Sequence, residues 1–214
     1  MDITIIGAGN MGRGIGTRAA AGGHAVTFVD NNGETAAKTA AEVQKAARYG
    51  AQVGFASLED VQFGDVVILA LWYGTNVETV KKLGSKLAGK VVVDIANPLN
   101  STYDGLATAP DSSSAEDVAR AADQGVKTVK AFNTTFAGSL LAGEVAGQPL
   151  DVFIAGDDAE AKEMVAQIVK DGGMRPVDTG PLSRARQIEG MQLLHIVIQN
   201  TLGTNWSSTV KVLS

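Results

Sequence analysis

The residues best suited to chemistry stand near the start of the chain, in the hexamer Gly7-Ala8-Gly9-Asn10-Met11-Gly12. An apolar run precedes the hexamer, a helical pattern follows it, and a second apolar run ends on Asp30. Glycines at this spacing allow a tight turn, a close approach of the backbone to a pyrophosphate, and close packing of helix on strand. The pyrophosphate then sits at the helix N-terminus, where free N–H groups and the helix dipole favour an anion. The pattern predicts a dinucleotide-binding site.

The acid at the end of the second apolar run bears on which cofactor is bound. Asp30 follows the glycines at about the offset expected for the carboxylate that hydrogen-bonds the ribose hydroxyls of NAD. A carboxylate repels the 2′-phosphate of NADP, and NADP sites normally have an Arg nearby. Asn31 and Asn32 can hydrogen-bond a phosphate, but they bring no positive charge. These residues therefore favour NAD over NADP.

Further candidates lie at the ends of the other predicted strands, because ligands of open α/β sheets bind outside the carboxyl ends of the strands. We expect the residues that end the fourth and fifth strands near the nicotinamide, where Trp72 and Tyr73 would form an apolar wall. Core packing or a subunit contact is the alternative for these two aromatics. The complete predicted cofactor set is Gly7, Gly9, Asn10, Met11, Gly12, Asp30, Asn31, Asn32, Leu71, Trp72, Asn97 and Pro98.

No arrangement of side chains indicates acid–base or nucleophilic catalysis, so we assign no catalytic residue. His24 stands in a turn on the side of the sheet away from the cofactor. His195 lies on the apolar stripe of the last predicted helix, where a core position is the alternative to a functional one. With no cysteine and two histidines, the sequence predicts no metal site. Hydride transfer between two bound rings needs only positioning, because the cofactors carry the electronic chemistry.

The elements that must position these residues alternate between strand and helix. Apolar runs predict strands at 3–6, 25–29, 52–55, 66–71, 90–95, 128–132, 151–155 and 174–177. Helical patterns lie at 10–21, 34–49, 75–87, 115–122, 159–170 and 182–199. This alternation predicts the α/β class, with a doubly wound Rossmann-type parallel sheet, helices on both faces and a small C-terminal helical addition. The predicted parts are an NAD(P)-binding Rossmann-like domain over residues 1–178 and a C-terminal helical segment over 179–214.

The overall composition argues against several classes of function. Of the 214 residues, 45% are hydrophobic and 19% charged, as in an ordinary globular protein. A net charge of −5 without a basic run argues against nucleic acid as a partner. No apolar run approaches the ~18 residues of a membrane helix, so we expect no membrane partner. The sequence shows no signal-peptide pattern, which makes a cytoplasmic location the expectation.

Short segments spread over nearly the whole chain carry a family resemblance. The most specific is Arg175-Pro176-Val177-Asp178-Thr179-Gly180-Pro181-Leu182-Ser183, whereas the glycine motif is shared with many dehydrogenases. The other segments are 97–99, 113–119, 130–134, 155–158 and 186–189. In this order they make the chain resemble the NADP-dependent oxidoreductases that use the deazaflavin coenzyme F420. The cytoplasmic domain of the membrane-bound ferric reductases is also similar.

The resemblance implies a second ligand beside the dinucleotide. The C-terminal segment would complete a cleft for this ligand, which is coenzyme F420 or a flavin. Asn133 and Thr134 would face it, and His195 is a further candidate on the substrate side. The resemblance favours NADP, whereas Asp30 favours NAD, and the two alternatives stay open.

Three functions are compatible with these observations. The leading hypothesis is an oxidoreductase that transfers hydride between NAD(P)H and a flat small-molecule acceptor, a deazaflavin or flavin-like compound. A small hydroxyacid dehydrogenase would need a catalytic lysine and a large helical C-terminal domain, but Lys211 is the only lysine after the last predicted strand. The third hypothesis is a non-catalytic NAD(P)-binding module that senses redox state. Trp206 and the tail Thr209–Leu213 are apolar for a terminus, which indicates docking on the body of the chain or on a partner subunit. The resemblance favours a homo-oligomer.

Overall fold

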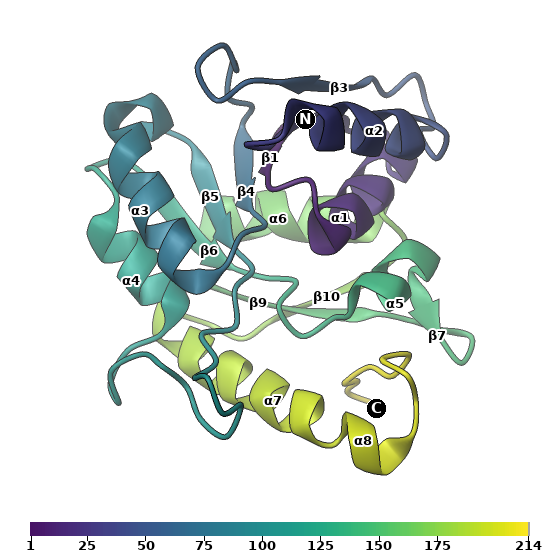
Figure 1. Cartoon of the computed structure of the whole chain (residues 1–214), viewed down its shortest axis with the longest axis vertical. Coiled ribbons are helices and arrows are strands. Elements are labelled where there is room, and N and C mark those ends of the chain that lie inside the picture. Colours follow the sequence, from purple (N-terminus) through teal and green to yellow (C-terminus); the bar gives the residue numbers. More distant parts are fainter. Residues whose placement is uncertain (214) are drawn as a thin grey trace.

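An eight-stranded sheet covered by helices forms the centre of the computed structural model, which describes residues 1–213 (Figure 1). Its strands lie in the order β10-β9-β6-β5-β4-β1-β2-β3. Their bounds are β1 Asp2–Ile6, β2 Ala25–Val29, β3 Val53–Ala56, β4 Val66–Leu69, β5 Val91–Asp94, β6 Lys127–Lys130, β9 Asp151–Gly156 and β10 Arg175–Asp178. A separate hairpin consists of β7 (Glu144–Val145) and β8 (Gln148–Pro149).

Helices fill most of the connections between the strands. The bounds are α1 Asn10–Ala21, α2 Gly33–Gln44, α3 Tyr73–Leu83, α4 Ser114–Ala121, α5 Ala137–Ala142, α6 Ala159–Asp171, α7 Ala185–Val197 and α8 Gln199–Leu202. Short 3-10 helices η1 (Gly84–Leu87) and η2 (Leu182–Arg184) precede β5 and α7. In the described part of the chain no helix is long and apolar enough to cross a membrane.

Two hydrophobic cores lie on opposite faces of the sheet. Alternate residues of a strand point to opposite faces, so Ile68 of β4 packs with α1 and α6, whereas Val67 and Leu69 pack with α3 and α4. The central strands of the sheet are buried on both faces. They therefore consist of continuous apolar runs rather than alternating patterns. The predicted doubly wound α/β fold with helices on both faces is confirmed.

The sheet is not parallel throughout, which corrects the prediction of a parallel sheet. β9 pairs with β6 in the antiparallel direction, while β10 is parallel to β9 and the other pairs are parallel. A parallel connection must return the chain to the opposite end of the sheet. The connection from β6 to β9 forms the short helix α5 and the β7–β8 hairpin instead of one long crossover helix, and the chain enters β9 from the end at which β6 finishes.

Several helical regions differ from their predicted bounds, among them the predicted helix 75–87, which is α3 (Tyr73–Leu83) followed by η1. The second helix ends at Gln44 instead of 49, because residues 45–47 hydrogen-bond three residues back instead of four. Tyr49 has a φ of 55° and Gly50 a φ of 79°, which exclude a right-handed helix there. The predicted helix 182–199 is divided among η2, α7 and α8. The short helix α5 was not predicted. It begins where the Ser139 hydroxyl accepts a hydrogen bond from the Phe136 N–H.

The C-terminal segment packs against the antiparallel side of the sheet. Ile188 of α7 joins a small core with Phe153 of β9, and α7 and α8 lie below β9 and β10 in Figure 1. The tail then returns to the start of β9, where Asp151 accepts hydrogen bonds from the Val212 N–H and from Lys211 Nζ, both at 2.9 Å. The apolar tail therefore docks on the body of the same chain.

Candidate functional site

A cavity of about 590 Å³ opens at the carboxyl ends of β1, β4 and β5. The strand order reverses between β1 and β4, and this switch point is where open α/β sheets bind their ligands. The cavity is lined by Gly7, Gly9, Asn10, Met11, Asp30, Ala70, Leu71, Trp72, Tyr73, Ile95, Ala96, Asn97, Leu99, Tyr103, Thr135, Phe136, Gln192, Ile196 and Trp206.

The glycine loop has the geometry that its sequence predicts. Gly7 has a φ of 107°, and a Cβ placed there would lie 2.4 Å from the carbonyl oxygen of Ala70. A Cβ on Gly12 would lie 2.0 Å from the carbonyl oxygen of Gly7, so this glycine packs α1 against the loop. A Cβ on Gly9 would meet nothing within 4 Å. Gly9 is also the N-cap of α1 and makes no side-chain cap, so the first N–H groups of α1 are available to an anion.

Asp30 stabilises the glycine loop through a hydrogen bond to its backbone. Its Oδ2 accepts a hydrogen bond from the Ala8 N–H and its Oδ1 accepts one from the Asn32 N–H, both at 2.9 Å. Asn32 caps α2, because its Oδ1 accepts from the N–H groups of Glu34 and Thr35. Asn31 is exposed, and neither asparagine lines the cavity. The Asp30 carboxylate is thus held by two backbone donors, which partly offset its negative charge.

The residues after β4 form one wall of the cavity. Trp72 precedes α3 and is 81% exposed at the rim. The Tyr73 hydroxyl donates a hydrogen bond to Asp117 Oδ2 at 2.5 Å. Burial and the Asp117 carboxylate raise the pKa of Tyr73 to about 12. Tyr73 is therefore a neutral phenol already engaged as a donor, and it cannot act as a general base near neutral pH.

The predicted substrate-side residues that follow β6 do not line the cavity. Asn133 is buried and exchanges two hydrogen bonds with Asn97, through its carbonyl oxygen and its own Nδ2. Thr134 is buried too, and neither it nor Asn133 lines the cavity. Phe132 has a φ of 64°, a conformation rare for a bulky residue, which turns the chain immediately after β6. The following residues Thr135 and Phe136 reach the cavity instead.

His195 supports the cavity without lining it. Its Nδ1 lies 3.1 Å from Gln192 Oε1, its Nε2 lies 2.7 Å from Ser208 Oγ, and its ring centroid lies 4.6 Å from that of Phe136. Burial lowers the pKa of His195, so the ring is neutral near neutral pH. It therefore fixes the cavity residues Gln192 and Phe136. His24 lies at the other end of the sheet, away from the cavity, with its Nε2 3.1 Å from Asp171 Oδ2.

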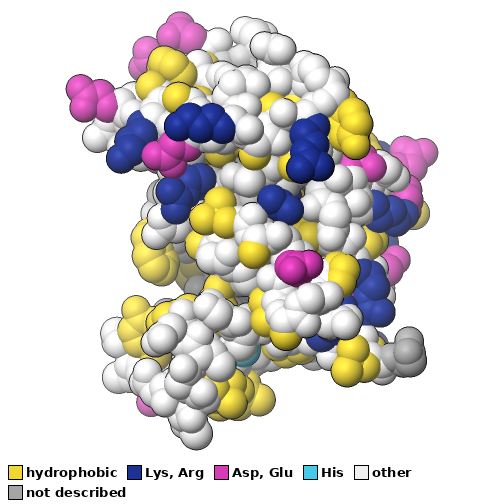
Figure 2. All heavy atoms as spheres, turned by 90° about the vertical axis from the view of Figure 1, so that its right-hand side faces the viewer, with side chains coloured by type: hydrophobic (Ala, Val, Ile, Leu, Met, Phe, Trp, Pro, Cys, Tyr) yellow, Lys and Arg dark blue, Asp and Glu magenta, His cyan; other side chains and the backbone are white. Residues whose placement is uncertain are grey.

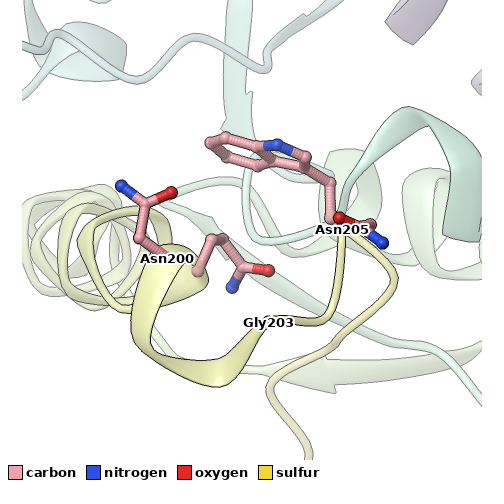
Figure 3. Close-up of a pocket in the computed structure, with 5 residues that line it drawn as sticks. Asn200, Gly203 and Asn205 are labelled. Carbon is pink, nitrogen blue, oxygen red and sulfur yellow. The ribbon is translucent and has the colours of Figure 1, made fainter.

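The C-terminal tail supplies an aromatic side chain that the sequence did not predict for the site. Trp206 lines the cavity, and its ring packs edge-on against Phe136 with centroids 5.2 Å apart. A smaller cavity of about 150 Å³ is lined by Gln199, Asn200, Gly203, Asn205 and Trp206 (Figure 3). Trp206 therefore lines both the main cavity and a small pocket rich in amide side chains.

A buried ionic cluster lies behind the floor of the cavity. Lys130 Nζ is 2.7 Å from Asp94 Oδ2 and 2.7 Å from Glu189 Oε1, and all three side chains are fully buried. The ammonium also donates to the carbonyl oxygen of Ala96 at 2.5 Å. Burial alone lowers the pKa of Lys130, but the two carboxylates raise it above its ordinary value. Charged residues inside otherwise apolar runs, such as Asp94, are the signal that sequence analysis overlooked.

The structure thus brings together most of the predicted cofactor residues and leaves several others outside the cavity. Outside its lining are Gly12, Asn31, Asn32, Pro98, Asn133, Thr134 and His195. The lining residues outside the predicted cofactor and substrate-side sets are mostly apolar or aromatic: Ala70, Tyr73, Ile95, Ala96, Leu99, Tyr103, Thr135, Phe136, Gln192, Ile196 and Trp206. Ala96 and Thr135 belong to the strand ends at which the sequence predicts ligand binding, and Phe136 follows directly after one of them. Within residues 1–213 no group of acidic and histidine side chains could hold a metal ion.

Comparison with known proteins places the chain in a family. The model of the family described as "NADP oxidoreductase coenzyme F420-dependent" matches residues 2–98. An F420-dependent NADP reductase of Methanocaldococcus jannaschii is 33% identical over 207 residues, which cover 92% of this chain and 91% of that protein. A crystal structure of a putative F420-dependent NADP reductase from Arthrobacter sp. FB24 has a TM-score of 0.82 at 29% identity and covers 99% of both chains.

A more distant relative differs in length. The rat metalloreductase STEAP3 is 30% identical over 191 residues, but the match covers only 36% of that protein against 89% of this chain. The full-length matches, rather than this partial one, therefore define the assignment. Together with the dinucleotide-type glycine loop at the switch point, they show that the chain belongs to the family of F420-dependent NADP oxidoreductases.

Proposed function

We propose that this protein transfers hydride between NADPH and coenzyme F420 or a similar flat acceptor. One observation carries the proposal: a single cavity joins the glycine loop at the start of α1 to an aromatic wall formed by Trp72, Phe136 and Trp206. The loop is suited to the pyrophosphate of a dinucleotide, and the aromatic side chains are suited to a planar ring. The names of the full-length relatives point to the same two ligands.

The residues present fit a dinucleotide. The space above Gly9 is open, and the N–H groups at the start of α1 are uncapped, so the pyrophosphate would sit against this turn. Asp30 lies on the adenosine side, after β2. The nicotinamide would then lie across the switch point, near Leu71, Trp72 and Asn97. Residues 1–178 would hold this cofactor, and α7 with the tail of segment 179–214 would complete the cleft.

Hydride transfer requires the protein mainly to position the two rings. Hydride chemistry is supplied by the nicotinamide and the acceptor when they are bound. The ionisable side chains in the cavity lining are those of Asp30, Tyr73 and Tyr103, and Tyr73 is engaged with Asp117. The walls would hold the two rings face to face and exclude water between them. Asn97 and Asn133, joined by two hydrogen bonds, would fix the floor between β5 and β6.

The proposed function is tested by mixing the protein with NADPH and one acceptor at a time: F420, FMN or a ferric chelate. Oxidation of NADPH, followed by its absorbance, is expected with F420 at the highest kcat/KM. Tight binding of NADPH without turnover of any acceptor would instead support the alternative, a non-catalytic redox-sensing module. The absence of an acid–base residue in the cavity is the observation compatible with that alternative.

A prediction about the adenosine side concerns the choice between NADPH and NADH. Asn31 is exposed beside the Asp30 turn, where the 2′-phosphate of NADPH would lie. Asn31→Arg is expected to tighten NADPH binding about fivefold and to leave NADH binding nearly unchanged, because it adds a positive charge beside the phosphate. Titration calorimetry with both cofactors measures the effect. Equal changes for the two cofactors would place the 2′-phosphate elsewhere.

We also propose a homo-oligomer that packs through the outer face of α7 and α8. Leu194 is 61% exposed, Val197 45% and Leu202 51%, in a spacing that forms one apolar stripe. Figure 2 shows hydrophobic and few charged side chains on the lower part of the molecule, below a surface with several Lys and Arg side chains. Sedimentation velocity is expected to give a dimer for the wild type and a monomer for Leu194→Glu with Val197→Lys. A wild-type monomer at micromolar concentration would contradict the proposal.

A further inference from the structure

The buried cluster of Asp94, Lys130 and Glu189 lies behind the floor of the cleft, and hydride transfer as proposed above makes no direct use of it. The three side chains have no exposed surface, and they join β5, β6 and α7. Lys130 Nζ contacts the carbonyl oxygen of Ala96, whose residue lines the cleft. The cluster is therefore separated from the nicotinamide side of the cleft by the backbone that follows β5.

The hydrogen bonds of the cluster suit two carboxylates and one ammonium. Both oxygens of Glu189 accept from the N–H of Ser114 at the start of α4, and Oε1 also accepts from Lys130. Asp94 accepts from Asn76 Nδ2, from the Ala96 N–H and from Lys130. Each of these bonds has a carboxylate oxygen as acceptor, which suits an ionised group. Burial raises the pKa of Glu189, and the Lys130 ammonium beside it opposes that shift. Two carboxylates and one ammonium give the cluster a net charge of −1.

A net buried charge is costly unless an opposite charge comes near it. The nicotinamide ring can provide that charge in one of its two redox states only. It is neutral when reduced and carries a positive charge when oxidised. Both signs of charge contact the Ala96 backbone, since Lys130 donates to its carbonyl oxygen and Asp94 accepts from its N–H. The second carboxylate, Glu189, lies directly behind Lys130, so a ring on the other side of Ala96 faces the combined field of the three groups.

We propose that the Asp94–Lys130–Glu189 cluster sets the redox-state preference of the cleft by favouring the oxidised, cationic nicotinamide. The inference rests on the proposed function. When hydride leaves C4 of the reduced ring with both bonding electrons, the ring gains one positive charge. The acceptor takes the hydride, and one proton from water completes its reduction. The cluster would stabilise the charge that develops on the ring, so it favours hydride transfer away from the reduced cofactor.

The proposal is tested by the ratio of two dissociation constants, that of NADP⁺ divided by that of NADPH. Glu189→Gln and Asp94→Asn each remove one negative charge at nearly constant shape. Each is expected to raise the ratio about three- to tenfold, mainly by weakening NADP⁺. Glu163→Gln on the outer side of α6, where Glu163 pairs with Lys170, is the matched control and leaves the ratio unchanged. Thermal unfolding of each variant without ligand shows that folded protein is compared.

The ratio separates an electrostatic role from a structural one. A purely structural role would change both dissociation constants by the same factor, and an unchanged ratio in the two folded variants would overturn the proposal. Asp94 lies on β5 and Glu189 on α7, so the test can be made as long as one of the two variants folds. If the wild type binds neither NADP⁺ nor NADPH, the proposed function fails, and this inference fails with it. Binding of both with an unaltered ratio in the variants contradicts the inference alone.

Discussion

Lys130→Met is expected to lower the free energy of unfolding by about 3–5 kcal/mol. The ammonium of Lys130 is fully buried and is the cation of its cluster, with Asp94 and Glu189 each 2.7 Å away. Its loss leaves two carboxylates in the interior without a charged partner and leaves the carbonyl oxygen of Ala96 without its donor. Breaking one side of a buried ion pair costs much more than the intact pair contributes, because the remaining charge keeps its desolvation penalty.

Urea denaturation of the variant measures this loss, and an exposed ion pair provides the control. Lys170 Nζ lies 3.1 Å from Glu163 Oε1, and both side chains are about half exposed or more. Lys170→Met is expected to change stability by about 0–1 kcal/mol. A triple variant, Asp94→Asn with Lys130→Met and Glu189→Gln, removes all three charges and is expected to be more stable than Lys130→Met alone. Equal, small losses for Lys130→Met and Lys170→Met would show that the cluster does not hold α7 to the sheet.

Gly9→Ala is expected to weaken dinucleotide binding about tenfold to a hundredfold and to leave stability within about 0.5 kcal/mol of the wild type. A Cβ at Gly9 meets no protein atom within 4 Å, and its φ of −73° is one that alanine adopts readily. The added methyl group therefore costs the empty protein little. It occupies the space through which the pyrophosphate approaches the N–H groups of α1, so hydrogen bonds to a charged ligand are lost.

Two other glycines make this comparison specific. Gly33→Ala, at the start of α2, also adds a Cβ in open space but lies outside the cavity, so binding and stability are both expected to be retained. Gly12→Ala is expected to destabilise the fold, since its Cβ would lie 2.0 Å from the carbonyl oxygen of Gly7. Calorimetric titration with NADPH and thermal unfolding give the two readouts. Full binding by Gly9→Ala would show that the pyrophosphate lies elsewhere.

The fold was predictable because its signals are local. The buried central strands are runs of Val, Ile and Leu, and glycines or an asparagine-proline pair follow them, so their positions along the chain could be predicted from the sequence. The antiparallel pairing of β9 with β6 was not predictable in this way. It depends on the path of the chain through α5 and the β7–β8 hairpin, and six-residue helices lack a clear period.

The residues of the candidate site show the same difference between local and long-range signals. Gly7, Gly9 and Asp30 belong to one motif with fixed spacing, and the structure places all three at the cavity. Trp206 reaches the cavity from an irregular tail in which it has a φ of 63°, and no sequence period indicates such a position. Lys130 and Glu189 are far apart in the sequence and meet only because α7 packs beside the end of β6. Long-range contacts of this kind are set by the tertiary fold, not by local patterns.

The central claim is direct hydride transfer from NADPH to a deazaflavin in this cleft, and isotope transfer tests it most directly. NADPH carrying deuterium at C4 of the nicotinamide is mixed with the protein and oxidised F420 in ordinary water. The hydride-accepting atom of a deazaflavin is a carbon, so a transferred label is retained. Mass spectrometry of the reduced F420 is expected to show one deuterium per molecule from one of the two C4 epimers of NADPH and none from the other. Reduced F420 without deuterium from either epimer, or no reduction at all, would contradict the account.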